Sequence, residues 1–323
     1  MNRRHAEIGD LTLESGRVLP SVSVSHRTWG TRAGGDAVLI EHALTGDSEV
    51  TSWWRDLVGP GLAIDTDRWF VVAADILGGC GETTGPTSLA PDGQPWRSRF
   101  PDLTVRDQVA AEILLADHLG VDRWHAVIGG SAGGMRALEW AVTAPERVER
   151  LFLLATSAAA SAEQIGLSAI QQTAIRNDPE NGLALARQIA HLTYRSEPEL
   201  AQRFGREVHD DGRFAVASYL AHHGDKLVRR FDADAYVTLT RAMDSHDVGR
   251  ERGGVVAALA RVTARTVVAG IDSDRLYPLA QQQELADGIP GADGLKVVTS
   301  LHGHDGFLIE SDQVGALARA LLD

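Results

Sequence analysis

The stretch that decides the fold is Trp124-His-Ala-Val-Ile-Gly-Gly-Ser131-Ala-Gly-Gly-Met-Arg-Ala-Leu-Glu-Trp140. Its first part, residues 125–128, is mainly apolar and predicts a buried strand. Its last part, from Met135 onward, consists largely of helix-forming residues. Between the two, residues 129–133 follow the pattern Gly-x-Ser-x-Gly. The stretch therefore predicts a strand and a helix that are joined by a tight turn with Ser131 at its tip.

A serine in such a turn is suited to nucleophilic chemistry. The turn strains the backbone around Ser131, and glycines are needed beside it because larger side chains would clash. Free N–H groups at the start of the following helix attract the negative charge that develops on an attacked carbonyl oxygen. Strand, glycine-flanked serine and helix together form the nucleophile elbow of the α/β-hydrolase fold.

The chain around this elbow alternates predicted strands and helices. Apolar runs predict strands at residues 38–40, 69–74, 148–155, 266–271 and 295–299. Helical spacing predicts helices at residues 105–119, where Thr104 is the expected N-cap, and at residues 279–286 and 310–322. Such alternation predicts a mostly parallel central sheet with helices on both faces.

This alternation stops in the middle of the chain. Residues 158–254 contain no convincing strand but carry helix-like stretches at 164–176, 183–192, 198–206 and 233–243. We interpret this segment as a helical lid insertion over the sheet. Residues 1–157 and 255–323 then form the α/β-hydrolase core domain.

Composition narrows the class of protein. The 323 residues carry a net charge of −13, which disfavours a nucleic-acid binder or a protein of anionic membranes. We expect neither a signal peptide nor a membrane span, because no suitable apolar run occurs. The single cysteine, Cys80, suits a reducing compartment, so a cytoplasmic location is expected. A lone cysteine usually behaves as a small hydrophobic residue, and we do not expect Cys80 to be the nucleophile.

A serine nucleophile needs an acid and a histidine later in the chain, in that order. Asp272 and Asp274 both follow the predicted strand that ends at residue 271, and His302 and His304 follow the next strand. The ends of parallel strands meet at one rim of the sheet, where ligands bind. The spacing alone leaves either aspartate and either histidine open as partners of Ser131.

Other chemistries have weaker support. A metal site of His302, His304 and Asp305 would lack a recognised zinc spacing, so no metal is expected. The glycine-rich residues 78–85 lack the lysine of a phosphate-binding P-loop and are interpreted as a tight turn near the site.

Two backbone N–H groups should stabilise an oxyanion. One belongs to Ala132, directly after the nucleophile. The other is expected in the turn that follows an early strand, and His42-Ala-Leu-Thr-Gly46 occupies that place. We therefore expect the second N–H to be that of Leu44.

At this point the residues resemble one family in particular, the homoserine O-acetyltransferases. The matching segments run along nearly the full chain and include His42-Ala-Leu-Thr-Gly46, Trp53-Trp54, Leu77-Gly-Gly-Cys80, Gly129-Gly-Ser-Ala-Gly-Gly134, Ala137-Leu-Glu-Trp140, Arg187 to Tyr194, Gly224-Asp-Lys226, Arg230-Phe-Asp232, Ser245-His-Asp-Val-Gly-Arg250, Ser273-Asp-Arg-Leu-Tyr-Pro278 and Gly303-His-Asp305. Several of these segments are long and unusual, which makes the resemblance specific.

The resemblance implies ping-pong transfer of an acetyl group from acetyl-CoA, a co-substrate, to the hydroxyl of L-homoserine, with no permanently bound cofactor. It implies Asp274 as the acid and His304 as the base. Arg187 and Tyr194 would face the substrate carboxylate, and Asp305 its ammonium group. It also implies a homodimer formed through the helical insertion. Close relatives use succinyl groups or accept serine, and water as acceptor would make an esterase, so these remain alternatives.

The chain departs from the family pattern in three places. Ala132 stands where the family usually has Met, which leaves the N–H in place but changes the pocket wall. Glu82 lies in a segment expected near the acyl pocket, where its charge would disfavour a succinyl donor. The insertion also looks short between Asn177 and Leu183.

Overall fold

A computed structural model describes residues 3–31 and 36–323; residues 1 and 2, at the start of the predicted core domain, lie outside this range. Its main sheet has eight strands in the order β1-β2-β6-β3-β7-β8-β9-β10. β1 and β2 are antiparallel, whereas the strands from β6 to β10 run parallel, which confirms the predicted mostly parallel sheet. The strands are β1 (Arg4–Thr12), β2 (Val18–Trp29), β3 (Ala37–Glu41), β6 (Phe70–Ala74), β7 (Ala126–Gly130), β8 (Arg150–Leu154), β9 (Arg265–Ile271) and β10 (Ala292–Val298), with a separate pair β4 (Val58–Gly59) and β5 (Ile64–Asp65).

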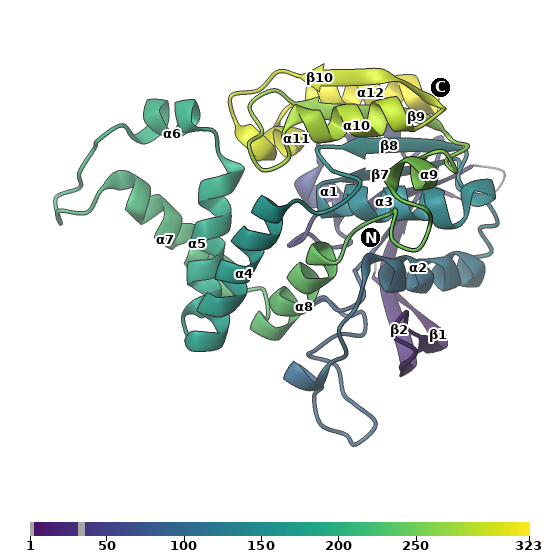
Figure 1. The fold of residues 1–323 in the computed structure, drawn as a ribbon, viewed down its shortest axis with the longest axis horizontal. Helices are drawn as coiled ribbons and strands as arrows, with labels where there is room; N and C mark the ends of the chain where they lie inside the picture. Colours follow the sequence, from purple (N-terminus) through teal and green to yellow (C-terminus); the bar gives the residue numbers. More distant parts are fainter. Residues whose placement is uncertain (1–2, 32–35) are drawn as a thin grey trace.

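Helices cover both faces of this sheet (Figure 1). α2, α3 and α10 pack on one face, and α1 and α12 pack on the other. The α-helices are α1 (Val50–Trp53), α2 (Val105–Leu119), α3 (Ala132–Thr143), α4 (Ala162–Asn177), α5 (Gly182–Tyr194), α6 (Glu197–Phe204), α7 (Ala215–Val228), α8 (Ala233–Asp244), α9 (Val255–Leu259), α10 (Leu279–Gly288), α11 (Gly306–Ile309) and α12 (Ser311–Leu322).

The predicted helix at residues 105–119 is confirmed with the same bounds. Thr104 accepts the N–H of Asp107 and Asp107 accepts the N–H of Thr104, so both backbone donors are satisfied in a capping box. Gly120 ends the helix in the left-handed conformation, at φ 67°. Local sequence signals therefore determined both ends of α2.

The N-terminal strands β1 and β2 were not predicted. Their pairing changes register between Glu7 and Gly9 and again between Gly9 and Leu11. Such bulges interrupt the period-two alternation from which strands are recognised. β2 nevertheless pairs antiparallel with β6, so that β1 and β2 together extend the sheet at one edge.

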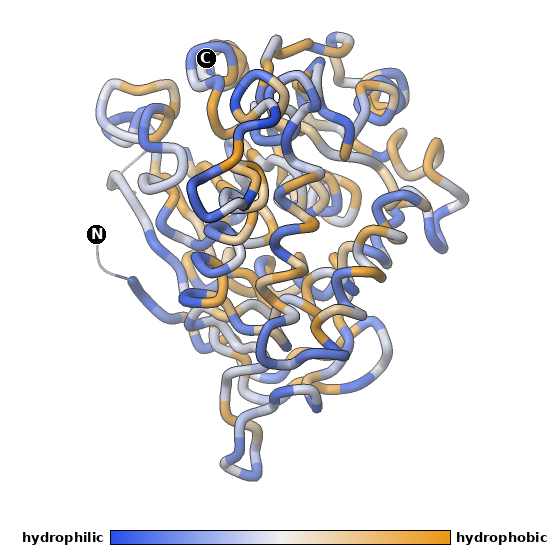
Figure 2. The backbone as a smooth tube through the Cα atoms, turned by 90° about the vertical axis from the view of Figure 1, so that its left-hand side faces the viewer, coloured by the Kyte–Doolittle hydropathy of each residue, from blue (hydrophilic) through white to orange (hydrophobic). Residues whose placement is uncertain are grey.

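Two apolar layers sandwich the sheet. Leu39, Val127 and Leu153 face the α2–α3 side, while Ile40, Ile128 and Phe152 face the α12 side, and all are almost completely buried. Figure 2 shows hydrophobic stretches recurring through the middle of the molecule. Strands buried on both faces explain why the sequence reads as continuous apolar runs.

The helices α4 to α8 follow β8 and lie to one side of the sheet (Figure 1). Between β8 and β9 the described chain adds no strand to the sheet. α7 was not predicted as a separate helix. A buried apolar cluster joins these helices to the ends of the core strands, with members Leu44, Ile76, Ala132, Ile175, Leu183, Ala186, Leu227, Phe231, Ala235, Tyr236 and Leu239.

The start of α3 lies directly against the end of β3. A Cβ atom at Gly133 would come within 2.1 Å of the Glu41 carbonyl oxygen, a backbone atom that has little room to move. We predict that Gly133→Ala lowers the free energy of unfolding by about 1–3 kcal/mol or more, measured by denaturant titration. Gly166→Ala in α4 is the control, because a Cβ there meets nothing within 4 Å. It should be neutral or stabilise by up to about 1 kcal/mol; equal losses in both variants would contradict the close contact.

Candidate active site

Ser131 lies at the turn between β7 and α3 and is the N-cap of that helix, with φ 57° and ψ −126°. A non-glycine residue with this φ costs on the order of 1–3 kcal/mol, so the surroundings must hold it. The Ser131 N–H donates to the Leu154 carbonyl at 2.9 Å, and the Thr156 hydroxyl donates to the Ser131 carbonyl at 2.9 Å. β8 and the segment after it therefore hold the turn in place through hydrogen bonds to the Ser131 backbone.

His304 and Asp274 complete a hydrogen-bonded series with Ser131. His304 Nε2 lies 2.8 Å from Ser131 Oγ, and His304 Nδ1 lies 2.6 Å from Asp274 Oδ2. All three residues are buried. This is the geometry in which a histidine takes a proton from a serine while an aspartate orients the imidazole.

The two competing residues have other partners. His302 Nδ1 lies 3.1 Å from Glu199 Oε1, and Asp272 Oδ1 accepts the N–H of Ser300 at 2.9 Å. Asp272 thus holds the loop that leads to the histidines. The geometry favours Asp274 and His304 as the partners of Ser131.

Backbone N–H groups and an aromatic ring hold the acid and the base in place. Asp274 Oδ1 accepts the N–H groups of Leu276 at 2.8 Å and Tyr277 at 2.9 Å. The buried Tyr277 ring stacks on the His304 ring, with centroids 5.0 Å apart and planes at 22°. Tyr277 was not predicted as a site residue, although it lies three positions after Asp274 in the same loop.

The pKa of His304 is raised above its ordinary value of 6.5. Burial acts to lower it, but the charge and hydrogen bond of Asp274 outweigh burial, with a further contribution from Asp305. A neutral imidazole is required to accept the serine proton. The site therefore loses its base as the pH falls through this raised pKa.

Leu44 and Ala132, the expected oxyanion donors, belong to the same buried cluster. Ala132 is the first residue of α3, so its N–H has no acceptor within the helix. Within the described chain, neither N–H donates to a backbone carbonyl. Neither N–H group therefore has, among the described residues, a backbone acceptor that would compete with a carbonyl oxygen of a substrate.

Arg136, which the sequence did not single out, holds the segment before Leu44. Its guanidinium donates to the His42 carbonyl at 2.9 Å and to Glu41 Oε2 at 2.8 Å, and its side chain is 1% exposed. Glu112 lies 3.2 Å away on α2. Burial and the charge of Glu41 raise the pKa of Glu112 well above its usual range, which favours the protonated form of that carboxyl group.

Arg187 and Tyr194 lie seven residues apart on one face of α5. Arg187 Nη1 is 3.5 Å from Thr45 Oγ1, and its guanidinium carbon is 5.5 Å from the centre of the Tyr194 ring. The Tyr194 ring centre is in turn 5.8 Å from that of His304. The structure thus places Tyr194 beside His304, and Arg187 beside Tyr194.

Asp305 is also beside the histidine, but its carboxylate already has a counter-ion. Asp305 Oδ2 lies 3.0 Å from Arg195 Nη2, a residue that the sequence did not indicate. Arg195 also lies 3.0 Å from Glu199, the partner of His302. Burial raises the pKa of Asp305, while Arg195 acts to lower it. The four residues tie α6 to the loop that carries His304.

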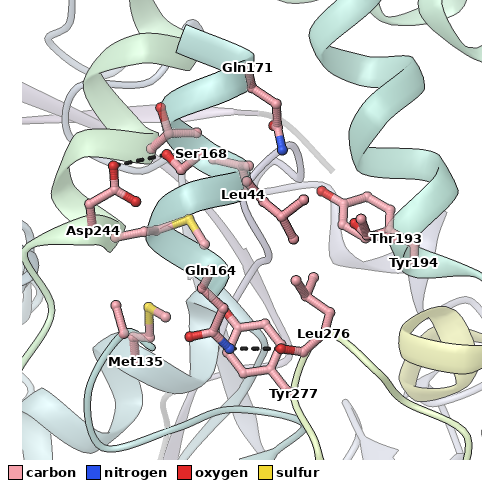
Figure 3. Close-up of a pocket in the computed structure, with 14 residues that line it drawn as sticks. Leu44, Met135, Gln164, Ser168, Gln171, Thr193, Tyr194, Asp244, Leu276 and Tyr277 are labelled. Carbon is pink, nitrogen blue, oxygen red and sulfur yellow. Dashed lines mark hydrogen bonds between the residues drawn. The ribbon is translucent and has the colours of Figure 1, made fainter. Parts of the chain in front are cut away.

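A small pocket opens beside these side chains (Figure 3). Leu44 and Leu276 point into it, and Tyr194 faces them from α5. Its volume of about 60 Å³ has room for only a few water-sized groups. Such a pocket suits a short acyl group or a small acceptor.

Cys80 and Glu82 have no catalytic geometry. Burial raises the pKa of the Cys80 thiol, which disfavours the reactive thiolate. Glu82 is about half exposed and lies 2.8 Å from both Arg3 and His5. The expectation that its charge would disfavour a succinyl donor is therefore weakened, because Arg3 and His5 already contact that carboxylate. The tight turn of this loop is evident at Gly85, where a Cβ would meet the Gly79 carbonyl oxygen at 2.2 Å.

The described residues contain no cluster of three or more His, Cys, Asp or Glu side chains arranged to hold a metal ion. The same part of the chain has no helix that is long and apolar enough to cross a membrane.

Comparisons with known proteins support the fold and identify relatives of the chain. A family model of the alpha/beta hydrolase fold matches residues 36–311, which confirms the predicted fold class. The homoserine O-acetyltransferase of Thermobifida fusca is 55% identical over 355 aligned positions, covering 99% of this chain and 94% of the relative.

Solved structures also align along the whole chain. A homoserine O-acetyltransferase from Bacillus anthracis has a TM-score of 0.91 at 24% identity, covering 100% of this chain and 97% of that one, and supports the fold. An acetylester hydrolase from Corynebacterium glutamicum has a TM-score of 0.89 at 26% identity, covering 99% of this chain and 96% of that one. The same backbone thus occurs in proteins named for transfer and for hydrolysis.

We predict that Asp274→Asn shifts the acidic limb of the pH–rate profile to lower pH, because His304 loses the charge that raises its pKa. The rate should fall by a factor on the order of 10⁴, since the imidazole is no longer held in the right tautomer. The measurement is the acylation burst with p-nitrophenyl acetate across pH.

The two histidines provide a matched comparison in the same assay. His304→Gln should abolish the burst, whereas His302→Gln should retain it. A burst that survives His304→Gln but not His302→Gln would reverse the assignment of the base.

Proposed function

Because this chain belongs to the homoserine O-acetyltransferase family of the α/β-hydrolase fold, we propose that it transfers an acetyl group from acetyl-CoA to the hydroxyl of L-homoserine. The reaction serves methionine biosynthesis. The observation that carries the proposal is the buried Ser131–His304–Asp274 series, with its 2.8 Å and 2.6 Å contacts, in a chain 55% identical to a named transferase.

In the first half-reaction, Ser131 Oγ attacks the thioester carbonyl while His304 Nε2 takes the hydroxyl proton. The N–H groups of Leu44 and Ala132 stabilise the negative charge on the carbonyl oxygen. The carbon–sulfur bond then breaks, and CoA leaves as a thiol after receiving the proton from His304. Acetyl-Ser131 remains.

In the second half-reaction, His304 takes the proton of the homoserine hydroxyl, whose oxygen attacks acetyl-Ser131. The bond to Ser131 breaks, and His304 returns the proton to Ser131 Oγ. Asp274 stabilises the imidazolium in both halves. The triad needs no resident cofactor for either step, and acetyl-CoA acts as a co-substrate.

Recognition of the amino acid is assigned to three side chains near His304. The Arg187 guanidinium, with Tyr194 beside it, would bind the substrate carboxylate. Asp305 would face the ammonium group from the loop of His304. Arg195 contacts Oδ2 of Asp305 at 3.0 Å and orients the carboxylate, so the other oxygen, Oδ1, would accept from the ammonium group.

We further propose that residues 158–254 act as a helical lid that shields the acyl-enzyme from water. These helices leave apolar side chains exposed, among them Ile165, Ile170, Leu185, Leu192 and Val228. Such residues suit the homodimer interface expected of the insertion, and a monomeric mass by light scattering would contradict that interface. The small substrates fit a cytoplasmic enzyme without nucleic-acid or membrane partners.

Hydrolysis is the second candidate function, favoured by the likeness to the acetylester hydrolase. Water and homoserine compete for the same acyl-serine, so the two activities differ only in the acceptor. Succinyl donors and serine as acceptor are further alternatives within the family.

We predict that acetyl-CoA alone releases one equivalent of CoA as Ser131 is acetylated, and that further release is slow because acetyl-Ser131 is shielded from water. L-homoserine should accelerate this steady-state release at least about tenfold. Thiol detection measures the rate, and Ser131→Ala is the inactive control. A panel of acetyl- and succinyl-CoA against homoserine and serine ranks the substrates. CoA release that ignores homoserine would instead indicate an esterase.

We predict that Arg187→Ala raises the KM for homoserine by roughly 10- to 100-fold, the effect of losing charge-assisted hydrogen bonds. Acetylation of Ser131 by acetyl-CoA should change little. Arg176→Ala, an exposed arginine on α4, is the control. If Arg187→Ala instead abolishes acetylation of Ser131, then Arg187 binds the donor or stabilises the fold.

A further inference from the structure

A second pocket, between α5 and α7, has a strongly basic lining. Its volume is about 180 Å³, and five of its six lining residues are Arg, Lys or His. They are Arg187 and His191 on α5, His223 and Lys226 on α7, and Arg230 just after α7. No carboxylate lines this pocket in the described chain. We call it the basic pocket.

The arginines and the lysine of the basic pocket are not paired with carboxylates in the part of the chain that the structure describes. The net charge is −13, yet within the described residues no carboxylate lies within 4.0 Å of Arg187, Lys226 or Arg230. Burial and then the charge of Arg187 lower the pKa of Arg230, and Asp47 opposes this only in part. Burial and the same arginine lower the pKa of His223 to about 4. Such mutual repulsion is relieved when an anion binds.

The pocket is held by close packing between its two helices. A Cβ at Gly224 would lie 2.8 Å from the Ala184 carbonyl oxygen, so α7 approaches α5 as closely as a glycine permits. The rings of His191 and His223 pack with centroids 3.9 Å apart. His191 Nδ1 also lies 3.4 Å from the Tyr219 hydroxyl. This packing holds together the two helices that carry Arg187 and Lys226.

The basic pocket adjoins the catalytic residues through Thr45. Arg187 reaches the Thr45 hydroxyl at 3.5 Å, and Arg230 donates to the Thr45 carbonyl at 2.8 Å. Thr45 directly follows Leu44, the proposed oxyanion donor. Arg230 also lines the neighbouring cavity, which Leu44 and His42 share. A long ligand with its anionic end in the basic pocket can therefore extend toward Leu44, through a cavity whose own lining includes Asp47, Asp75 and Glu82 and so suits an uncharged arm.

We propose that the basic pocket binds the phosphate groups at the nucleotide end of acyl-CoA, with Lys226 and Arg230 as the cations dedicated to the donor. The inference rests on the proposed function. Acyl-CoA carries its phosphates and its thioester at opposite ends of a flexible arm. Arg187, on the wall nearer to Tyr194, remains for the carboxylate of the acceptor, so the two anions are bound by different cations.

The kinetic test compares two donors, acetyl-CoA and S-acetyl-pantetheine, which lacks the phosphates. The Lys226→Ala/Arg230→Ala double variant should raise the KM for acetyl-CoA by about tenfold, as the loss of two exposed ion pairs implies. The KM for S-acetyl-pantetheine and that for homoserine should stay unchanged. Arg229→Ala, an exposed neighbour outside the pocket, is the control and should alter none of these values.

Equal effects on both donors, or an effect on homoserine alone, would overturn the proposed phosphate site. If the wild-type protein transfers acetyl groups from neither donor, the proposed function itself fails. Calorimetric titration then still tests the pocket. Adenosine 3′,5′-bisphosphate should bind the wild-type protein and about tenfold more weakly the double variant. Equal binding by both proteins, or a preference for inorganic phosphate, would contradict a site for the nucleotide end of CoA.

Discussion

The contact between the end of β3 and the start of α3 is the constraint on which the site depends. Gly133 brings the helix against the Glu41 carbonyl, and the buried Arg136 side chain reaches back to the His42 carbonyl. These contacts place the turn that carries Leu44 beside Ala132 and Ser131. The proposed nucleophile and the two proposed oxyanion donors are thereby assembled from segments almost 90 residues apart in the chain. The ion pair with Glu41 at 2.8 Å offsets part of the cost of burying Arg136.

Charge is distributed around this assembly in a way that suits a two-substrate reaction. Asp274 and Asp305 lie beside His304 and raise its pKa. Arg187 and Arg230 meet at Thr45 and line the basic pocket. In the proposed function, Asp305 faces the ammonium group and Arg187 the carboxylate of the acceptor, and the basic pocket binds the phosphates of the donor. The loops after β9 and β10 provide the two aspartates, whereas the segment from α4 to α8 provides the two arginines.

Much of the fold and the centre of the site could be predicted from the sequence, because their signals are local. The glycines around Ser131, the cap at Thr104 and the apolar runs of the parallel strands each occupy a few adjacent residues. β1 and β2 escaped prediction because bulges at Gly9 interrupt their alternation. The order serine, acid, histidine identified two loops, but spacing alone could not separate Asp272 from Asp274.

The remaining features depend on contacts between residues distant in sequence. His302 and His304 differ only in what the rest of the fold places opposite them, which is Glu199 for one and Ser131 for the other. Arg136 gave no sequence signal because its partner Glu41 lies 95 positions earlier. Arg195 likewise gave no sequence signal, because its partner Asp305 lies far from it in the sequence.

The central claim is that Ser131 carries an acetyl group that homoserine removes. Mass spectrometry of the protein mixed rapidly with acetyl-CoA tests it most directly. The account predicts one acetyl group on the Ser131 peptide that persists without acceptor and disappears, with formation of O-acetylhomoserine, when L-homoserine is added. An acetyl group on another residue, or one on Ser131 that decays at the same rate with and without homoserine, would contradict the account.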